Sequence, residues 1–415
     1  METQPKTAIV IGAGIIGCSC ALWLHKKGFR ITLVDPDSPG TGTSSGNACT
    51  IADYGCVPVN HPDLPRRLPR LMFMRDSPLS VNLAYAMTHP LWMLDFLSNC
   101  KDYKVARIIR ILGKLLKKTY EGLNPLIEMT GSQDLLKRNG AMYLYRNQQV
   151  YEEALPSNQA RQPQGVEYTE VNAGEIRELE PHLKLPFEHG LLFEKASQVL
   201  DPKALCERYF DYLQRNGSTH LRQRAVKIQT APGFARLLLD NGETLQADRI
   251  VVAAGAFSKS IHGISAGALP LDTERGYHIQ YSGMQQLANR PLCWNAGGFY
   301  ATPTSLGLRF AGTVEIAGYR PKKNPRNLHY LRQRAQQMFD LPDQPDSDWL
   351  GFRPTFPDAL PVIGYSPVSE FVLVAFGHHH LGLTLAGITG KLIAELANGE
   401  PASHNIKPFR AQRFF

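Results

Sequence analysis

The chain has 415 residues, 43% of them hydrophobic and 20% charged, which is typical of a globular protein large enough for about two domains. No stretch reaches the roughly 18 to 20 uninterrupted apolar residues of a membrane-spanning helix, so the sequence predicts no membrane span. The formal net charge of +8 favours an anionic substrate or an anionic membrane surface, and it is too diffuse to indicate nucleic-acid binding.

Targeting signals and cysteine usage narrow the class further. The first residues, METQPK, carry no basic region ahead of a long apolar run, so we expect no signal peptide and a cytoplasmic protein. The seven cysteines include no C-x-x-C pair and no cluster with histidines, which argues against zinc, iron–sulfur clusters and a disulfide framework. We therefore expect no metal site.

The first unit, residues 7–35, has the pattern of a strand, a glycine turn, a helix and a second strand. Gly12, Gly14 and Gly17 follow the first apolar run at the G-x-G-x-x-G spacing, which leaves backbone N–H groups and the positive end of a helix facing a pyrophosphate. Asp35 closes the second strand, where a carboxylate accepts a hydrogen bond from a ribose hydroxyl and disfavours the 2′-phosphate of NADP. The unit predicts a dinucleotide site, with the expected contacts Gly12, Gly14, Ile15, Ile16, Gly17, Asp35 and Pro36.

A polar stretch rich in glycine, serine and threonine follows over residues 36–55. Its hydroxyls and backbone N–H groups suit phosphate and ribityl oxygens, and the alternative is a plain surface loop. Because the stretch directly follows the dinucleotide unit, we favour cofactor contacts. The expected ones are Ser44, Ser45, Gly46, Asn47 and Ala48.

An irregular connection is expected over residues 58–78, and two helices over 81–99 and 102–120. The second helix places aliphatic residues on one face and lysines and arginines on the other. Such a basic amphipathic helix is either a solvated face over a core, which we favour, or a membrane-surface helix.

The middle of the chain combines strands with one capped helix. Residues 139–195 alternate short apolar runs with turns, which predicts an antiparallel sheet. Asp201 is placed to cap a helix that ends near residue 216, and Asn241 with Gly242 marks a hairpin turn. An apolar strand over 249–253 ends in small residues that let backbone approach a ligand. The expected cofactor contacts in this part are Val226, Ala254 and Gly255.

A second β-rich block begins at residue 271, and a strand over 371–376 precedes a glycine-opened helix that ends near residue 399. The N-terminus of that helix can direct its dipole at a bound charge. The two β-rich blocks are separated by residues 201–260, so we expect two interleaved domains, each built from non-contiguous pieces.

Several pieces of the sequence occur in a characteristic order: VIGAGIIG, TSSGNACTI, DSPL with PLWMLDFLSNC, ADRIVVAAGAFS, GLRFAGTVE, GFRPTFPDALPVIG and GHHHLGLTLA. Together they resemble the FAD-dependent D-amino acid oxidase and dehydrogenase superfamily, specifically its bacterial D-amino acid dehydrogenase branch. Each piece is a weak signal, whereas their order across nearly the whole chain is specific. The resemblance implies FAD rather than NAD.

The resemblance also implies the architecture. The fold class is α/β, with an FAD-binding Rossmann-like domain of glutathione-reductase type interleaved with an α+β substrate domain whose sheet is mainly antiparallel. We expect residues 1–80, 196–265 and 350–415 to form the FAD-binding domain, and residues 81–195 and 266–349 to form the substrate domain.

The chemistry implied by the resemblance is hydride transfer from the substrate Cα to flavin N5, so the protein mainly binds and positions its substrate. A substrate carboxylate is best held by the planar fork of an arginine. Arg309 and Arg353 match family positions near the substrate, and the choice between them stays open. Tyr277 and Tyr300 are weaker candidates for hydroxyl contacts, since aromatic residues in β-rich segments are more often core.

The run of histidines 378–380 stands where the C-terminal helix begins. Adjacent side chains diverge and no carboxylate or cysteine accompanies them, so a metal site is disfavoured. We expect the backbone of Gly382, Leu383 and Thr384 to face the flavin pyrimidine. One histidine, His379 in our assignment, then reaches the substrate.

The sequence departs from the branch where residues 274–278 read ERGYH in place of a lysine-glycine-tyrosine-serine run. This departure puts D-alanine-type specificity in doubt. The pattern resembles relatives that act on D-proline or D-hydroxyproline, and we expect a quinone or another carrier to accept the electrons. No cysteine follows Cys293, so we expect non-covalent FAD.

The alternatives to this function are a glycine or sarcosine oxidase that makes hydrogen peroxide, and a flavoprotein subunit or RNA-associated module that depends on partner chains. Peripheral attachment to the inner membrane and a homo- or hetero-oligomeric state stay open.

Overall fold

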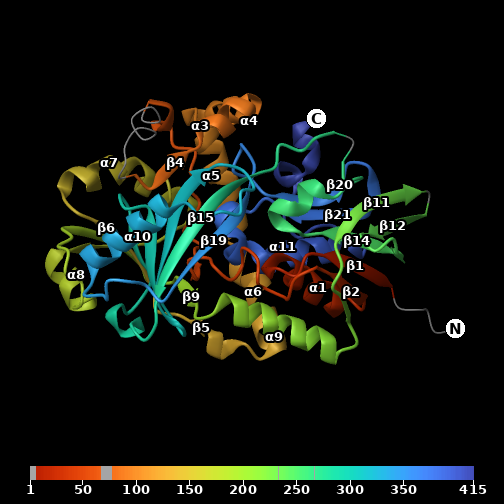
Figure 1. Cartoon of the computed structure of the whole chain (residues 1–415), viewed down its shortest axis with the longest axis horizontal. Helices are drawn as coiled ribbons and strands as arrows, with labels where there is room; N and C mark the ends of the chain where they lie inside the picture. Colours follow the sequence, from red (N-terminus) through yellow and green to blue (C-terminus); the bar gives the residue numbers. More distant parts are fainter. Residues whose placement is uncertain (1–5, 67–76, 232, 266) are drawn as a thin grey trace.

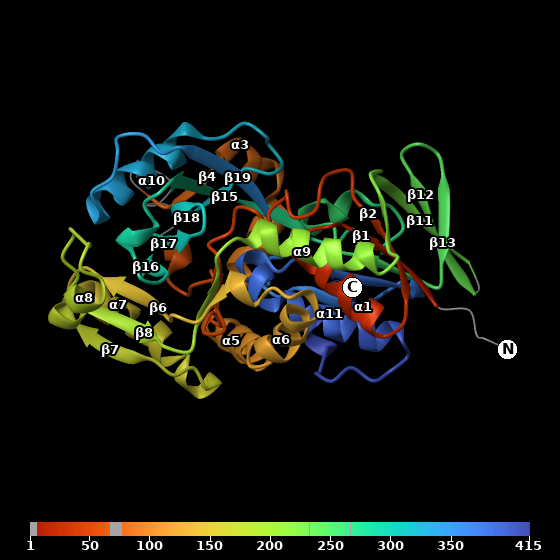
Figure 2. The same ribbon diagram turned by 90° about the horizontal axis from the view of Figure 1, so that it is seen from below.

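Two sheets organise the chain, which the computed structural model describes over residues 6–66, 77–231, 233–265 and 267–415. Figure 1 shows them side by side, with the N-terminal strand in one lobe and the long strand β15 (Asp272–Tyr281) in the other. The turned view in Figure 2 shows the helices α5 (Asp102–Leu116) and α6 (Thr119–Thr130) beside α11 (Gly382–Ala397). The chain crosses between the lobes repeatedly, as the interleaved arrangement predicts.

The first sheet carries the glycine turn. Its strands run in the spatial order β10 (Thr219–Leu221), β2 (Arg30–Val34), β1 (Thr7–Ile11), β14 (Arg249–Val252), β21 (Ser369–Phe376) and β20 (Val362–Ser366). The first five pair in parallel and β20 pairs antiparallel to β21. A parallel sheet is buried on both faces, which explains why β1, β14 and β21 are almost uninterrupted apolar runs.

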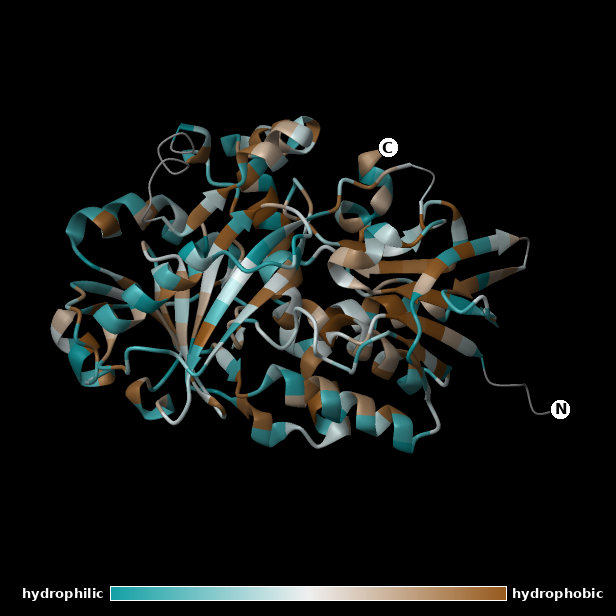
Figure 3. Ribbon diagram, viewed as in Figure 1, coloured by the Kyte–Doolittle hydropathy of each residue, from teal (hydrophilic) through white to brown (hydrophobic). Residues whose placement is uncertain are grey.

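The two faces of this sheet are covered differently. Side chains alternate with the period of a strand, so Val10 faces one core and Ile11 the other. Helices α1 (Ile15–Lys26) and α11 cover the first face. The second face is covered by the antiparallel strands β11 (Ala225–Ala231), β12 (Phe234–Leu239) and β13 (Thr244–Ala247). Figure 3 shows the hydrophobic colouring concentrated in the strands between these layers.

Helices α1, α6 and α11 approach one another at glycines. A Cβ on Gly387 would lie 2.5 Å from the backbone oxygen of Gly122, and one on Gly390 would lie 2.6 Å from that of Ser19. The indole Nε1 of Trp23 donates to the Gly122 carbonyl at 3.2 Å. The three helices therefore pack with backbone against backbone, which is possible only for residues without a side chain.

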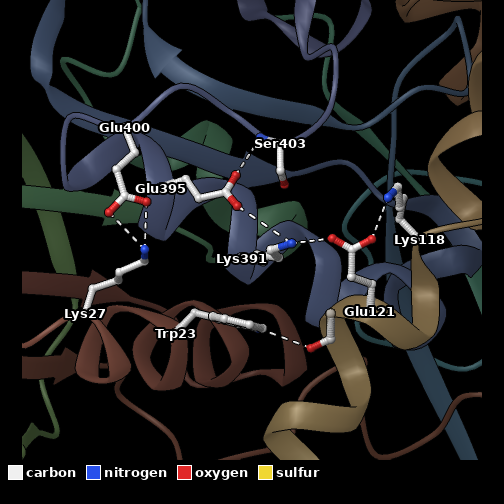
Figure 4. A network of polar contacts seen from close by, with 9 residues as sticks. Trp23, Lys27, Lys118, Glu121, Lys391, Glu395, Glu400 and Ser403 are labelled. Atoms are coloured by element: carbon white, nitrogen blue, oxygen red, sulfur yellow. Dashed lines mark hydrogen bonds and ion pairs between the residues drawn. The ribbon is translucent and has the colours of Figure 1, made fainter.

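Ion pairs at the outer edge join the same helices (Figure 4). Glu121 of α6 binds Lys391 of α11 and also Lys118, whose Nζ is 2.6 Å away. Lys27, just after α1, pairs with Glu400 just after α11 at 2.6 Å. These pairs are half exposed, so they contribute little stability individually.

The second sheet has nine strands within the described residues and is mainly antiparallel, which confirms the expected α+β character. Its order is β19 (Ser347–Thr355), β15, β18 (Gly307–Ile316), β17 (Phe299–Thr304), β16 (Leu292–Trp294), β6 (Ala141–Tyr145), β8 (His189–Phe193) and β7 (Thr169–Asn172), with β4 (Leu79–Val81) paired to β18. Helix α10 (Pro325–Met338) packs on β15 and β18. Shorter elements beside it are β3 (Thr50–Ile51), β5 (Leu136–Lys137), β9 (Ser197–Val199), α7 (Gln148–Gln159) and α8 (Ala173–Leu179).

The predicted helices are confirmed with adjusted ends. Helix α9 (Pro202–Arg215) is capped by Asp201, whose carboxylate accepts hydrogen bonds from the N–H groups of Lys203 and Ala204 at 2.9 and 3.1 Å. The helix expected over residues 81–99 is instead two helices, α3 (Leu83–Thr88) and α4 (Pro90–Ser98). The break lies at the residue before Pro90, because proline disfavours the helical conformation of its predecessor.

The domain boundaries remain a prediction, and the structure indicates where they need adjustment. The expected boundaries at residues 80 and 350 fall inside β4 and β19, which are continuous strands of the second sheet. Helices α5 and α6 pack in the core of the first sheet, beside α1 and α11. Part of the irregular connection expected over 58–78 lies outside the described residues.

Across the described ranges of the chain, none of the helices combines the length and apolar character needed to cross a bilayer.

The helix contact at Gly387 gives a first prediction. We expect Gly387→Ala to lower the free energy of unfolding by about 1–3 kcal/mol, since the new methyl group overpacks a backbone contact. Urea denaturation of the holoprotein measures the change. The exposed substitution Glu128→Ala on α6 is the control and should leave the midpoint nearly unchanged. Equal midpoints for Gly387→Ala and the wild type would contradict this account of the packing.

Candidate dinucleotide and substrate site

A cavity of about 500 Å³ lies where the first sheet meets the second. Its walls come from the carboxyl ends of β1, β2, β14 and β21, from residues 35–48, and from β17, β18 and β19 of the second sheet. Crevices at the carboxyl ends of parallel strands are where open α/β sheets bind ligands. The cavity therefore joins a dinucleotide-type edge to a second, antiparallel wall.

The glycine turn forms one end of the cavity. Gly12 has φ +105°, and a Cβ there would lie 2.5 Å from the Ala253 oxygen. A Cβ on Gly17 would overlap the Gly12 oxygen, so Gly17 lets α1 pack against the turn. Helix α1 begins without a side-chain cap in its own first turn, while Ser44 Oγ accepts from the Ile15 N–H at 2.9 Å. The helix N-terminus is therefore open to an anionic group in the cavity.

Asp35 is fixed beside this turn. Its carboxylate accepts hydrogen bonds from the N–H groups of Ala13 at 2.7 Å and Asp37 at 2.9 Å. Burial raises the pKa of Asp35, and the two backbone N–H groups oppose that shift. Asp35 and Pro36 both line the cavity, so the carboxylate stands where a ribose hydroxyl would need an acceptor.

The loop over residues 44–48 is attached to the second sheet through its carbonyl groups. Arg309 Nη1 donates to the Ser45 and Asn47 oxygens at 2.9 and 3.1 Å. His278 Nδ1 donates to the Gly46 oxygen at 3.0 Å, and Thr302 Oγ1 donates to the Ala48 oxygen at 2.9 Å. Each carbonyl from 45 to 48 thus has a partner in the second sheet.

Arg309 and Tyr277 lie away from the cavity lining. Besides the loop carbonyls, Arg309 donates through Nε to Gln280 Oε1 at 3.1 Å. Tyr277 is buried in the core, where its hydroxyl donates to Glu315 Oε2 at 2.5 Å. The structure therefore places Arg309 as a brace of the cofactor loop and Tyr277 as a core residue, in contrast to the substrate contacts expected from the sequence.

Arg353 lines the cavity. Its Nη1 and Nη2 donate to the carbonyl oxygens of Thr313 at 2.8 Å and Gly312 at 3.3 Å. A Cβ on Gly276 would lie 2.6 Å from Arg353 Nε, so the guanidinium lies flat over a strand that carries no side chain there. Burial lowers the pKa of Arg353, and the Glu274 carboxylate opposes that shift.

Tyr300 lines the cavity from β17 and belongs to a buried tyrosine cluster. Its hydroxyl donates to the Tyr143 hydroxyl at 3.2 Å and lies 3.4 Å from that of Tyr54. Burial raises the pKa of all three tyrosines, so they remain neutral hydrogen-bonding groups.

The histidine turn closes the far end of the cavity. His379 has φ +52°, an unusual conformation for a non-glycine residue, and its Nε2 lies 3.2 Å from the Phe356 oxygen. The His378 Nε2 lies 3.0 Å from Thr389 Oγ1. Helix α11 begins directly after this turn without a side-chain cap, and Gly382 and Leu383 line the cavity. The described residues contain no group of three or more potential metal ligands.

Most of the residues expected from the sequence meet in this cavity. Those that line it are Gly12, Gly14, Ile15, Ile16, Asp35, Pro36, Ser44, Asn47, Ala48, Ala254, Gly255, Tyr300, Arg353, His379, Gly382 and Leu383. Those that do not are Gly17, Ser45, Val226, Tyr277, Arg309 and Thr384. Thr384 instead accepts from the Ala52 N–H at 2.9 Å, and Val226 follows Arg224 and Ala225, which do line the cavity.

Sequence reasoning missed Trp349 and Glu274. Trp349 lines the cavity, stacks on the His278 ring at 5.2 Å and occupies the space that a Cβ on Gly46 would need. Glu274 lies two residues before Gly276, over which the Arg353 guanidinium lies, and it is paired with Arg353 across β15 and β19. The ERGYH run marks Glu274 as unusual, whereas nothing local marks Trp349, because its role depends on a contact more than 300 positions away in the chain.

The residues present suit a large dinucleotide. The N-termini of α1 and α11 both border one cavity, with Ser44 bound to the first N–H of α1 and no side-chain cap on α11. Asp35 stands at the ribose position, and the glycine turn leaves room for backbone contact with a pyrophosphate. The second sheet closes over the part of the cavity next to β21. This fold and cavity define a dinucleotide-binding protein whose cavity has a second, antiparallel wall.

Comparison with known proteins specifies the family. Residues 7–396 match the family described as FAD dependent oxidoreductase (DAO). A D-amino-acid oxidase from Bradyrhizobium diazoefficiens is 31% identical, with 99% of each chain covered. The chain belongs to this family of FAD-dependent oxidoreductases, which confirms the family-level resemblance and the fold class; membership of the D-hydroxyproline dehydrogenase branch stays a prediction.

Solved structures share the fold. The glycine oxidase from Geobacillus kaustophilus superposes with a TM-score of 0.73 at 20% identity, covering 99% of this chain and 98% of that chain. The iminodiacetate oxidase from Chelativorans sp. BNC1 gives a TM-score of 0.73 at 20% identity, with 98% of each chain covered.

The loop brace gives a second prediction. Arg309→Lys removes the Nη1 that binds two carbonyls of the 44–48 loop and the Nε that binds Gln280. We therefore expect the Kd for FAD to rise about 10- to 100-fold, the effect of about 1–3 kcal/mol from lost buried hydrogen bonds. Titration of apoprotein with FAD measures this Kd. The exposed Arg236→Lys serves as control. An unchanged Kd for FAD with a raised substrate KM would instead make Arg309 a substrate ligand.

Proposed function

We propose that the protein catalyses FAD-dependent oxidation of a D-amino acid, with small secondary amino acids such as D-proline or D-hydroxyproline as the substrate class and a quinone or another carrier as electron acceptor. The chemistry that FAD supplies when bound is acceptance of a hydride at N5. The imino acid product then reacts with water outside the redox step. The D-amino-acid oxidase relative supports the amino acid class and the D configuration.

The observation that carries the proposal is the state of Arg353. The guanidinium lines the cavity, and it donates hydrogen bonds to two backbone carbonyls. Within the described part of the chain, no carboxylate lies within ion-pair distance of it. Glu274 acts on this buried cation electrostatically from beyond ion-pair distance, so the guanidinium can still bind an anionic ligand in the cavity, and its planar fork suits a carboxylate.

The other residues at this wall position the substrate. Tyr300 presents a neutral aromatic surface to the cavity that Arg353 lines, and the histidine turn lines the same cavity. Since hydride transfer needs little acid–base chemistry, the rate depends on holding Cα at one position and excluding water. Cofactor attachment is proposed as non-covalent, because burial raises the pKa of the cavity-lining thiol of Cys293 to about 12 and keeps it unreactive.

The second candidate is an oxidase of the glycine or sarcosine type, which the shared fold of glycine oxidase favours. It differs in using oxygen and forming hydrogen peroxide. A third is a flavoprotein subunit of a heteromeric amine dehydrogenase, which the size-exclusion mass of the purified protein would reveal.

The deciding experiment is anaerobic reduction of the bound flavin by a panel of D- and L-amino acids that includes both proline series, glycine and sarcosine. We expect rapid bleaching by a D-series secondary amino acid and slow reoxidation in air. Fast reoxidation with peroxide would identify the oxidase alternative. A flavin that no amino acid bleaches would overturn the proposal.

Arg353 supplies the third prediction. We expect Arg353→Lys to raise the KM for the best substrate by at least about tenfold while FAD content stays normal, since lysine cannot form the bidentate contact. Gly276→Ala should act similarly, because its methyl group displaces the guanidinium. The exposed Arg236→Lys is the matched control for both. Normal steady-state kinetics in Arg353→Lys would remove this arginine from the substrate site.

A further inference from the structure

Two buried polar atoms, one on Glu274 and one on His379, lie close together without a hydrogen bond, and of the two residues His379 lines the main cavity. Glu274 is 1% and His379 is 6% exposed. Their Oε2 and Nδ1 atoms are 3.9 Å apart, which is too long for a hydrogen bond. Within the described residues, neither atom has another hydrogen-bond partner. An unsatisfied buried polar atom is costly, and two that face each other call for an explanation.

The tautomer of His379 follows from its other nitrogen. The Phe356 carbonyl oxygen, 3.2 Å from Nε2, can only accept, so Nε2 carries the hydrogen. In a neutral imidazole Nδ1 then has a lone pair and no hydrogen. An ionised Glu274 is likewise an acceptor only. The gap is therefore bordered by two acceptors and requires a donor with at least two hydrogens.

The surroundings of the gap determine which donor it accepts. Glu274 and Arg353 are directly opposed in the pairing of β15 with β19, and Arg353 lines the cavity together with His378, His379 and His380. A guanidinium that holds a carboxylate would therefore place the neighbouring atoms of that ligand beside Glu274. In an α-amino acid the group next to the carboxylate-bearing carbon is the amino group.

A second, apolar cavity of about 160 Å³ lies on the other side of Glu274. Glu274 lines it together with aliphatic and aromatic residues that include Leu79, Met93 and Phe96. Gly298, Thr313 and Val314 line both cavities, so Glu274 stands at their common wall. Apart from the Thr313 hydroxyl, which has no hydrogen-bond partner among the described residues, the side chains of this second cavity supply no donor, so a charged donor to the carboxylate has to come from the main cavity.

We infer that Glu274 and His379 together bind the protonated amino group of the substrate, and that they select amino acids whose nitrogen carries at least two hydrogens. Primary ammonium and secondary ammonium ions meet this requirement, and tertiary ones do not. The inference rests on the proposed function, in which Arg353 binds the carboxylate of the same substrate.

The same geometry provides a path for the amine proton. Hydride departure from Cα requires a neutral amine, so one N–H bond must break first. The proton moves to His379 Nδ1, where a new N–H bond forms, the electron pair of the broken bond stays on the amine nitrogen, and the positive charge moves to the imidazolium. Glu274 stabilises that charge from 3.9 Å. No other reactant takes part in this step.

The fixed backbone of the histidine turn supports this role. His379 is held at φ +52°, and Gly377 before it has φ +83° with Phe356 packed where its Cβ would be. Strain of this kind persists where the surrounding structure enforces it, and His379 Nδ1 is held 3.9 Å from Glu274 Oε2. A residue retained only for packing would have no need of that orientation.

The test uses holoenzyme and the N-methylated forms of the best substrate found by flavin bleaching. When methylation lowers the number of N–H hydrogens from two to one, as from proline to N-methylproline, we expect the rate of anaerobic flavin reduction at low substrate to fall about 10- to 100-fold, the loss of one hydrogen bond to a charged group. Methylation that leaves two hydrogens on the nitrogen should lower the rate of flavin reduction much less. Equal rates across the series would overturn the inference.

Variants separate hydrogen bonding from steric bulk. Glu274→Gln keeps the shape and removes the charge, and His379→Asn suits the left-handed backbone. Both variants should lower the rate of flavin reduction by the parent substrate at low concentration. Both should also reduce the loss of rate that methylation causes, whereas a loss caused by steric bulk would persist. His379→Asn should also shift the pH profile of kcat/KM to higher pH, because the amine must then lose its proton to solvent.

Controls and outcomes are distinguishable. Glu243→Gln and His262→Asn, both exposed and outside the cavity lining, should behave as wild type. If a variant loses FAD or fails to fold, the methylation series on the wild type decides alone. Wild-type protein that no amino acid bleaches overturns both proposals, while normal bleaching with an unchanged methylation penalty in Glu274→Gln overturns only the inference.

Discussion

The structure depends on one run of four carbonyl groups. The oxygens of residues 45–48 all accept hydrogen bonds from Arg309, His278 and Thr302 of the second sheet. Burial lowers the pKa of His278 to about 3, so it is a neutral donor to the Gly46 oxygen at any ordinary pH. Because the loop follows the glycine turn, these bonds fix the second sheet relative to the dinucleotide edge. The cavity exists only where both sheets are held in that relation.

Much of the fold could be predicted because its signals are local. The G-x-G-x-x-G turn, the Asp201 cap and the apolar runs of β1, β14 and β21 each occupy a short stretch, and short stretches determine strands, caps and turns. The break before Pro90 was also readable from proline chemistry, although the sequence prediction extended one helix across it. The end of α5 at Leu116 carried no comparable signal, and there tertiary packing decides.

The candidate site was less predictable because it depends on register. Arg309 and Arg353 look equivalent in the sequence, since each stands in an apolar, glycine-containing strand. Only the pairing of strands shows that one reaches back to the 44–48 loop while the other lies over Gly276 and faces the cavity. Tyr277 and Tyr300 differ for the same reason, because alternation along paired strands sends one to the core and the other to the cavity.

The order of strands in the first sheet has a consequence for biosynthesis. Strand β21 lies between β14 and β20, and α11 packs on α1, so residues 369–397 complete a layer that the first residues begin. A chain emerging from the ribosome can form β1, α1 and β2 early, but it has no partner for the outer edge of β14 until the last elements leave the exit tunnel. Until then the outer edge of β14 stays unpaired and the cavity lacks the wall that residues 375–383 supply, so cofactor capture must follow the synthesis of these residues.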